Sequence, residues 1–524
     1  MQAAAGRPTQ MEKGAELSME LEFERDHLHD HETVLDTTLC QEETLEAIVP
    51  DACPDIRRIV DCCGQVCLTG KQAQDGAAAV SGVIRAAVLY QPEGGTTLKK
   101  LELSLPFSCR AECAAMTQAA EIVASPRLRR IEARALNPRK VLLRVDLAVD
   151  LLVLQPRERT ICTQATEESG NGLCQLWEQR ETYILSAVRE RPFSMSETVR
   201  LPVGDGVEIL SCRGTALCGE SRLIGSKLIF KGSIDLQLLL QDGSGGLTAH
   251  QESLAFSQVM EAAGAGEDST CDMDVELTDL SWQPAGEDGR SIEISAELLA
   301  QAMVWERRPL QLLRDLYSTS CLTQVQTEEL ALTQLVDRSV RTQSVRELLE
   351  TAAPAHSAVD CWLSLGQVEQ QREGDGVNVT AQIQLTALYL NDEGQLQSVQ
   401  RAAQAVCRVE CPQEAECRVR CRWSGEMFAA LAAGGVEVRC SLDFFCTVLA
   451  RQSVTMAVRG ELGEKRAAEA GEQPSVVLRL AAPGERLWDI AKAYGTTREE
   501  IRLANGLEED ETSEHTMLLI PRVR

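Results

Sequence analysis

Four cysteines come closer to a metal-binding motif than any other residues in the sequence. Cys407, Cys411, Cys417 and Cys421 are separated by three, five and three residues. Common zinc knuckles place two residues between paired cysteines, so this spacing does not match them. On a strand, residues four apart share a face, and buried thiols pack there as small hydrophobic groups. We therefore expect core cysteines, with zinc binding as the alternative.

Other residues that could do chemistry lack the partners that the chemistry needs. His27, His29 and His31 would share one face of a strand and could bind a metal, but no acidic or cysteine ligands are spaced to complete a site. Gly214 and Gly219 have the spacing of a phosphate loop, but Glu220 follows them, and its charge would repel phosphate. We found no His-Glu-x-x-His helix and no Gly-x-Ser-x-Gly turn. The sequence therefore predicts a protein that is not an enzyme and holds no cofactor or metal.

A local basic cluster stands out because the chain carries a net charge of −27. A patch of this kind could receive an acidic partner. The alternative is a solvated strand face whose charges are paired with acidic neighbours. The residues of this possible interaction patch are Arg127, Arg129, Arg130, Arg134, Arg139 and Lys140.

The elements that would position these residues are predicted to be strands. In Val80–Tyr90 apolar and polar side chains alternate, as expected for a strand with one buried face. Leu228–Leu240 and Val377–Tyr389 repeat the pattern. Aligning Val80 with Phe230 and Val379 gives steps of 150 and 149 residues. The sequence therefore predicts a mainly β protein, with three antiparallel, sandwich-like repeat domains.

We place the three repeats at residues 31–160, 175–310 and 335–456. Each closes on a long alternating strand, of which Val141–Val153 is the clearest. Residues 1–30 are expected to be a partly disordered leader, and 457–475 a polar linker. Leu310–Tyr317 and Ser344–Thr351 are predicted to be short helices.

Composition excludes several classes of partner. The acidic charge and the 6 Trp, 5 Tyr and 8 Phe in 524 residues argue against nucleic acid, which needs a basic surface or stacking rings. No run approaches the roughly 20 apolar residues of a membrane span, and the N-terminus lacks the apolar core of a signal peptide. We expect a cytoplasmic protein without direct membrane insertion, whose 20 cysteines are reduced thiols.

Residues 476–524 carry the most specific local pattern. Leu487, Ile490, Ala491 and Tyr494 lie on one face of a predicted helix, and Gly495 follows as its cap. Thr497 and Glu500 have the spacing of a capping box for a second helix, which Gly506 would end. With strands at both ends, the order is strand, helix, helix, strand (βααβ), in a small α+β domain.

This tail resembles a LysM domain. The residues that carry the resemblance are Pro483-Gly484, Leu487-Trp488-Asp489-Ile490-Ala491, Tyr494-Gly495-Thr496, Asn505 and Ile520-Pro521. The resemblance implies binding of N-acetylglucosamine glycans such as peptidoglycan, in a groove between the loop before the first helix and the loop after the second. The implied partner- or glycan-binding residues are Gly484, Glu485, Arg486, Leu487, Trp488, Asn505 and Gly506. Trp488 could be an exposed binding hot spot or a core residue.

The first repeat resembles the sporulation-associated SPOCS domain. The residues are Ile48-Val49-Pro50-Asp51, Pro54-Asp55-Ile56, Gly82, Leu89-Tyr90, Pro106-Phe107 and Asn137-Pro138-Arg139-Lys140. Repeats two and three match more loosely. Three such repeats before a LysM domain resemble the SipL-type spore-coat morphogenetic proteins. The resemblance implies a mother-cell scaffold at the forespore surface that binds a coat morphogenetic ATPase of the stage IV sporulation protein A type through its LysM domain. The alternatives are a peptidoglycan-binding cell-wall or cortex protein and a wall hydrolase.

Overall fold

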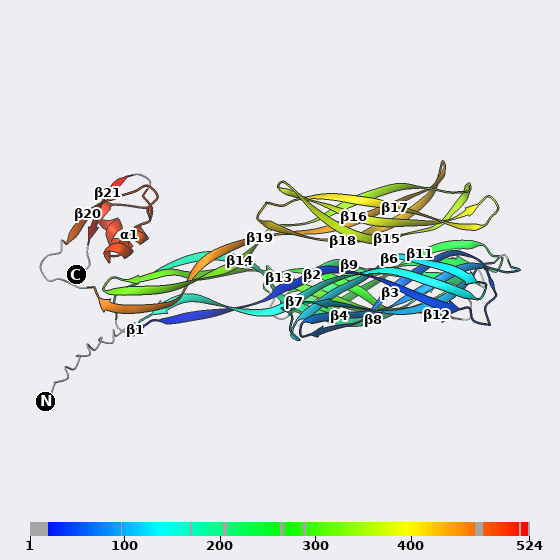
Figure 1. Cartoon of the computed structure of the whole chain (residues 1–524), viewed down its shortest axis with the longest axis horizontal. Coiled ribbons are helices and arrows are strands. Elements are labelled where there is room, and N and C mark those ends of the chain that lie inside the picture. The colour runs from blue at the N-terminus through cyan, green and yellow to red at the C-terminus, as the bar shows by residue number, and fades with distance from the viewer. Residues whose placement is uncertain are drawn as a thin grey trace, which may run out of the picture.

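The computed structural model shows three β-sandwich units, a set of long paired strands, and a small C-terminal unit (Figure 1). It describes residues 19–95, 97–167, 170–202, 207–262, 266, 268–286, 290–466, 475–512 and 515–521. Residues 1–18 of the expected leader lie outside the described residues. The structure is mainly antiparallel β, so the predicted fold class is confirmed.

Each unit contains six strands in the same order. Unit 1 has β2 (Glu22–Ile48), β3 (Ile56–Gln74), β4 (Ala77–Pro92), β5 (Lys99–Glu112), β6 (Glu121–Asn137) and β7 (Lys140–Thr166). Unit 2 has β8 (Leu173–Arg200), β9 (Glu208–Ile224), β10 (Lys227–Gln241), β11 (Leu247–Glu261), β12 (Thr270–Ala285) and β13 (Ser291–Ser318). Unit 3 has β14 (Cys321–Glu350), β15 (Ala355–Glu373), β16 (Gly376–Asn391), β17 (Leu396–Glu410), β18 (Ala415–Ala432) and β19 (Gly435–Lys465).

In every unit the second, third and fourth strands form one sheet, and the first, sixth and fifth form the other. The short strand β1 (Met19–Glu20) adds to β19. The register also repeats. Val80 pairs with Lys71 in unit 1, Phe230 with Ser221 in unit 2, and Val379 with Gln370 in unit 3. The alignment of Val80, Phe230 and Val379 from the sequence is therefore confirmed by the strand pairing.

The apolar faces of the two sheets in each unit enclose a separate core. The alternating face from Val141 to Val153 lies in the core of unit 1, with Val80 and Ile84 from the facing sheet. A glycine makes room in this core. A Cβ atom on Gly82 would lie 2.4 Å from Cζ of Phe107, the residue opposite it on β5, and Gly232 and Phe256 repeat the arrangement in unit 2. The pairing of Gly82 with Phe107 in the first repeat is thus explained by packing, because the phenylalanine ring fills the space that a side chain at position 82 would take.

The first and last strands of each unit run beyond its sandwich as a two-stranded ribbon, and the ribbons extend toward the C-terminal unit (Figure 1). All three ribbons share an apolar cluster that includes Leu28, Ile161, Leu312, Leu332 and Met456. The prediction of a loose leader is wrong for residues 22–30, because these residues pair with β7. Three ribbons bury one another's apolar side chains, so these extensions do not need a sandwich of their own.

The two predicted helices are also wrong. Leu310–Tyr317 lies in β13 and Ser344–Thr351 lies mostly in β14. Leu310 and Leu312 pack among the ribbons, and a register shift between Leu313 and Asp315 then breaks the alternation. An extra residue in a strand leaves apolar side chains at spacings that resemble helical periodicity.

The C-terminal unit has the predicted order of elements. It comprises β20 (Val476–Ala481), α1 (Leu487–Tyr494), α2 (Arg498–Asn505) and β21 (Thr516–Pro521), with β20 and β21 antiparallel. Gly495 and Gly506 cap the helices in the left-handed conformation, and Thr497 and Glu500 form the predicted capping box. The expected linker is wrong for residues 457–465, which belong to β19, while 467–474 lie outside the described residues. Among the described residues, no helix is long and apolar enough to span a membrane.

Candidate functional site

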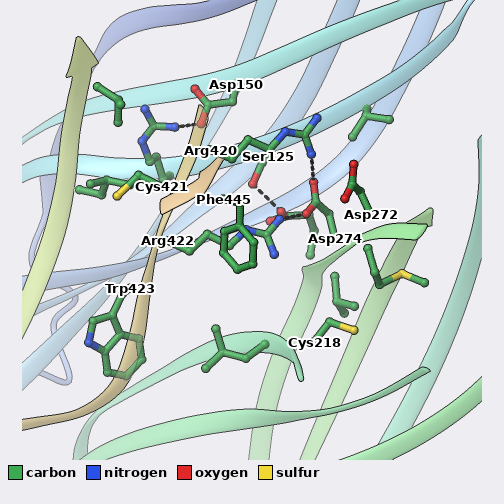
Figure 2. A pocket seen from close by; sticks show the side chains of 18 of the residues that line it. Ser125, Asp150, Cys218, Asp272, Asp274, Arg420, Cys421, Arg422, Trp423 and Phe445 are labelled. Carbon is green, nitrogen blue, oxygen red and sulfur yellow. Dashed lines mark hydrogen bonds and ion pairs between the residues drawn. The ribbon is translucent and has the colours of Figure 1, made fainter. Parts of the chain in front are cut away.

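The three units enclose a cavity of about 1170 Å³. Its walls include Gly64 and Gln65 from β3, Asp274 from β12, and Trp362 and Arg420 from β15 and β18. Strands that lie far apart in sequence therefore face a common space (Figure 2). Contacts between packed domains are usually apolar, but the walls of this cavity carry many charged side chains. We therefore treat the cavity as a candidate site.

The charges in the cavity follow a two-residue period on two strands. On β12, Asp272, Asp274 and Glu276 occupy alternate positions, and on β18 Arg418, Arg420 and Arg422 do the same. Alternate residues of a strand share a face, so an acidic row of unit 2 and a basic row of unit 3 both line the cavity.

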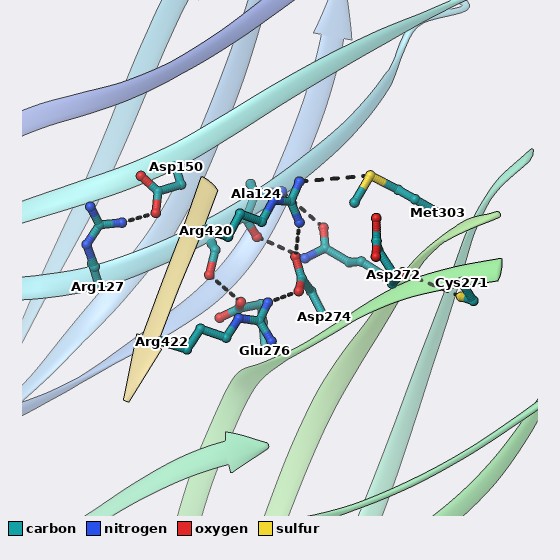
Figure 3. A network of polar contacts seen from close by, with 12 residues as sticks. Ala124, Arg127, Asp150, Cys271, Asp272, Asp274, Glu276, Met303, Arg420 and Arg422 are labelled. Atoms are coloured by element: carbon teal, nitrogen blue, oxygen red, sulfur yellow. Dashed lines mark hydrogen bonds and ion pairs between the residues drawn. The ribbon is translucent and has the colours of Figure 1, made fainter. Parts of the chain in front are cut away.

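Asp274 joins the two rows. It is 5% exposed, and its Oδ2 accepts a hydrogen bond from Nη1 of Arg420 at 2.6 Å. Arg422 forms an ion pair with the other carboxylate oxygen of Asp274 (Figure 3). A buried carboxylate held by two guanidinium groups is compensated for its loss of water. Asp274 therefore ties unit 3 to unit 2 across the cavity.

Unit 1 supplies further polar contacts to the same space. Ser125 Oγ donates to Glu276 of unit 2, and Arg127 forms an ion pair with Asp150 within unit 1. Arg127 Nη2 also donates to the carbonyl of Gly366 in unit 3 at 3.2 Å. Each unit thus bonds to the other two at the cavity.

The surroundings of Glu276 shift the pKa of its carboxyl. Burial raises the pKa of its carboxyl to about 7, against the hydrogen bond from Ser125, which favours the charged form. A carboxyl whose pKa is raised on folding binds more protons in the folded state, so its contribution to stability falls as pH rises from about 4.5 to about 7.

Replacing Glu276 with glutamine should remove this pH dependence. Glutamine keeps an oxygen that can accept from Ser125 but cannot become charged. We expect E276Q to be more stable than the native chain at pH 8, by an amount on the order of 1 kcal/mol, and equally stable near pH 4. Thermal unfolding of both proteins across this range measures the difference. A difference that does not change with pH would contradict the assignment.

A second contact among the units is formed by apolar residues at equivalent positions of the three units. Three sets of apolar residues, each spaced by the 149- or 150-residue repeat, form one cluster. The sets are Val60, Leu210 and Val359; Leu89, Leu239 and Leu388; and Leu98, Leu247 and Leu396. The units are therefore arranged around a pseudo-threefold axis, to which each contributes the same three positions.

The polar residues that follow break this symmetry. The position after Val60, Leu210 and Val359 holds Asp61, Ser211 and Asp360. Arg213 Nη2 donates to Asp360 Oδ2 at 2.6 Å, and the guanidinium lies 4.1 Å from the ring centre of Trp362. Burial raises the pKa of Asp61 to about 7, against its hydrogen bond from Ser398. One arginine therefore lies among carboxyl groups of units 1 and 3.

The structure places the six residues of the basic cluster in different environments. Arg127 lines the cavity, Arg130 forms an ion pair with Glu132, Lys140 with Glu46, and Arg134 is exposed. Nε of Arg129 is buried and has no hydrogen-bond partner.

Arg139 has a structural role. Its guanidinium donates to the carbonyls of Val49 and Cys53 and to the carboxylates of Asp51 and Asp55, at 2.8–3.0 Å. It thereby holds the Pro50–Pro54 loop against the β6–β7 turn.

The cysteines and histidines singled out in the sequence have ordinary surroundings. Cys407 and Cys411 are buried in the core of unit 3, and Cys417 and Cys421 pack against it. His27 and His29 are exposed on β2, while Nδ1 of His31 lies 3.1 Å from the carbonyl oxygen of Leu185. Among the described residues, no group of three or more His, Cys, Asp or Glu could hold a metal ion.

The C-terminal unit is fastened to the end of β13. Trp488 is 3% exposed, and its Nε1 donates to Asp315 Oδ2 at 2.8 Å. Lys492 Nζ also donates to Asp315, at 2.7 Å, and the ring of Tyr317 packs edge-on against Trp488 with centroids 4.8 Å apart. The hydroxyl of Tyr317 donates to the carbonyl of Thr496 at 2.7 Å. The hypothesis of an exposed Trp488 is therefore wrong, because this side chain joins the tail to the ribbons.

The two loops that resemble the walls of a LysM groove are bonded to each other. Gly484 N donates to Thr512 O at 2.7 Å, and Leu487 N donates to Asp510 O at 2.8 Å. Glu485 pairs with Arg479, and Arg486 with Asp489. The side chain of Asn505 exchanges two hydrogen bonds with the backbone of Leu519, so it links α2 to β21. Gly506 ends α2, and Leu487 is buried.

Sequence reasoning missed the charged rows on β12 and β18 and the Arg213–Asp360 pair. The rows had a visible signal, because acidic side chains alternate at 272, 274 and 276 and basic ones at 418, 420 and 422. The buried pair had no such signal, since an isolated arginine and an isolated aspartate are ordinary in any strand.

These observations define a class of protein with three copies of one six-strand unit around a shared polar cavity and a small α+β unit at the end of their ribbons. Residues 55–136 and 207–284 match the family model described as SipL, SPOCS domain. Each match covers the second to fifth strands of a unit, β3–β6 and β9–β12. The match supports SPOCS repeats of the SipL type and indicates a sporulation-related protein. No curated protein and no solved structure gives a significant match.

Proposed function

We propose that this chain is a non-enzymatic scaffold for spore-coat assembly in the mother-cell cytoplasm, docked at the forespore surface. In this proposal the C-terminal unit is a LysM-type domain that binds a coat morphogenetic ATPase of the stage IV sporulation protein A type. The observation that carries the proposal is the SPOCS match in two of three copies of the same unit.

The way the units are joined supports a structural role. Apolar residues at equivalent positions, the Arg213–Asp360 pair and the Asp274 contacts hold three sandwiches together. The charged side chains of the cavity are engaged mainly with one another, as at Asp274 and Asp150, and not arranged as a nucleophile with a base. A body of this kind suits a protein that spaces its partners.

Features of the C-terminal unit favour a protein partner over a glycan. Between the loops at 482–486 and 507–512, Gly484 N donates to Thr512 O and Thr512 N donates to Glu485 O, so these backbone groups are not available to a sugar. The tryptophan is also engaged, because Trp488 packs on Tyr317 and donates to Asp315. A peptidoglycan-binding wall or cortex protein remains the second candidate, since the LysM resemblance itself implies glycan binding.

The test compares the full chain with a chain that lacks residues 475–524. Both are assayed for binding to the purified ATPase by biolayer interferometry and for sedimentation with purified peptidoglycan. We expect the full chain to bind the ATPase and the shortened chain to lose most of that binding. Circular dichroism of the shortened chain checks that its sandwiches are still folded.

The outcomes separate the candidates. Sedimentation of the full chain with peptidoglycan, without ATPase binding, would replace the scaffold with a wall-binding protein. Equal ATPase binding by both chains would move the docking site from the tail to the SPOCS units.

A further inference from the structure

One face of the two-stranded sheet in the C-terminal unit is apolar and exposed. Leu478, Leu480 and Met517 are 67%, 59% and 58% exposed, and Val476 and Leu519 belong to the same face. Leu478 pairs with Leu519 and Leu480 with Met517 across the strands. Side chains directly opposite each other on antiparallel strands touch, so these residues form one continuous surface. We call Val476, Leu478, Leu480, Met517 and Leu519 the sheet face.

The opposite face of the same sheet makes the core of the unit. Leu518 and Ile520 are fully buried with Leu487 and Ile501 from the two helices. The core therefore does not need the five residues of the sheet face. Single exposed apolar residues are common on protein surfaces, but a contiguous group commonly marks an interaction site.

The apolar surface of the tail around Trp488 is already used, so it is not open to a partner as the sheet face is. Trp488 and Tyr317 pack against each other where α1 meets β13, and Asp315 bonds to both Trp488 and Lys492. A partner that reached Trp488 would have to displace the tail from the ribbons. A partner that reaches the sheet face leaves this joint intact.

Charge indicates what kind of partner fits. Residues 475–524 carry nine acidic and seven basic side chains, and five of the basic ones lie in the described part of the tail. The five bases are engaged within the chain: Arg479 with Glu485, Arg486 with Asp489, Lys492 with Asp315, Arg498 with Asp510, and Arg502 with the carbonyl of Glu508.

The acids include the exposed run Glu508–Glu511. This run leads into the end of the sheet where Ala481 pairs with Thr516, because Thr512 is bonded to Ala482. An apolar surface with an acidic border attracts a segment with the opposite border.

We propose that the sheet face of β20 and β21 is a docking surface for a segment of a partner protein that carries apolar residues bordered by lysine or arginine. The inference rests on the proposed function in one respect: the coat ATPase is the partner that should present this segment. A second copy of the chain fits less well, because two acidic borders would meet in a chain of net charge −27. A glycan also fits less well, since the sheet face has no aromatic ring and no hydrogen-bonding side chain.

The test changes the sheet face in the full chain. In the double variant Leu478→Gln with Leu519→Gln, two exposed side chains become polar and the core of the unit is untouched. We expect affinity for the purified ATPase to fall by roughly tenfold or more, as loss of central apolar contacts does at other interfaces. Leu503→Gln is the matched control, because Leu503 is 84% exposed on α2, outside the sheet.

A second variant tests the charge. Glu508→Lys with Glu509→Lys should weaken binding and reduce its dependence on salt, because opposite charges attract less after the change. If the native chain binds the ATPase and neither double variant binds more weakly than the Leu503→Gln control, the docking surface is wrong and the proposed function stands.

If the native chain does not bind the ATPase, the proposed function fails, and a synthetic peptide of alternating leucine and lysine probes the surface directly. Equal binding of this peptide to the native chain and to the Leu478→Gln, Leu519→Gln variant would overturn the proposal. Light scattering tests whether a second copy of the chain occupies the sheet face. If the native chain is a dimer and the Leu478→Gln, Leu519→Gln variant is a monomer, the face belongs to the dimer contact and the proposal of a partner protein is overturned.

Discussion

Replacing Arg213 with methionine is expected to lower the free energy of unfolding by about 3–5 kcal/mol, the usual cost of removing one member of a buried ion pair. In the described structure, the guanidinium of Arg213 is the only charged group that bonds directly to the carboxylate of Asp360, at 2.6 Å, and the change removes it. Asp360 is 7% exposed, so water cannot take over the role of the guanidinium. The methionine also loses the contact between the guanidinium and the ring of Trp362.

The loss should affect all three units, because the pair lies beside the pseudo-threefold cluster. Asp61 of unit 1 is close enough to Arg213 for the arginine to lower its pKa in part, although burial dominates and raises it to about 7. Without Arg213, both Asp61 and Asp360 must become protonated or be exposed. We therefore expect the destabilisation to be larger at pH 8 than at pH 5, because the free energy needed to keep a carboxyl protonated grows with each pH unit above its unfolded pKa of 3.8.

Two further variants test the reason for the effect. Arg222→Met changes an exposed arginine on the same strand, β9, and should have little effect. Arg213→Met combined with Asp360→Leu removes both charges and should recover much of the lost stability, because no buried charge is left unpaired. Thermal unfolding followed by circular dichroism measures all three proteins. Equal losses for Arg213→Met and Arg222→Met would show that the pair does not hold the units.

Much of the fold could be predicted from the sequence because it depends on alternation within single strands. Val80, Phe230 and Val379 hold equivalent positions in the three alternating stretches, and the strand register repeats at the same steps. The C-terminal unit was predictable for a similar reason, since Thr497 with Glu500, and Gly495 and Gly506, are local capping signals. Each of these features is complete within a few residues of the chain.

The ribbons were not predictable in this way. Each ribbon buries its apolar residues against the two other ribbons. Its burial pattern therefore depends on residues that are far away in the sequence. In β13, Leu310 faces one cluster, Leu316 a second and Tyr317 a third. A bulge between Leu313 and Asp315 shifts the pattern further, and it places Asp315 where the tail docks. A short window of sequence contains none of this information.

The contacts among the units were hidden for a related reason. Asp274 and its partner Arg420 are both visible as members of alternating charged rows, but their pairing depends on how unit 3 sits against unit 2. Trp488 shows the same limit. Its neighbours in the helix could not decide whether it was exposed, because the residue that accepts its hydrogen bond, Asp315, belongs to another unit.

Replacing Asp274 with alanine should loosen unit 3 from the other two. The carboxylate is buried and binds both Arg420 and Arg422, so its removal leaves two neighbouring guanidinium groups of β18 without their shared anion. We expect a loss of about 3 kcal/mol of interaction free energy, near the lower end for a broken buried pair because the two arginines are partly exposed. Small-angle X-ray scattering should show a larger radius of gyration, and limited proteolysis should cleave faster between β13 and β14.

Two further variants test whether the loosening caused by Asp274→Ala is due to the lost charge contacts. Glu297→Ala removes an exposed carboxylate from β13 of the same unit and should leave both measurements unchanged. Arg420→Met and Arg422→Met, introduced together with Asp274→Leu, remove the whole charged group and should restore the compact shape if the unpaired arginines cause the loosening. If Asp274→Ala stays as compact as the native chain, then the apolar cluster around Leu89, Leu239 and Leu388 holds the units without help from the cavity. The charged rows would then serve to select which unit packs beside which, because acidic β12 and basic β18 attract each other and like rows repel.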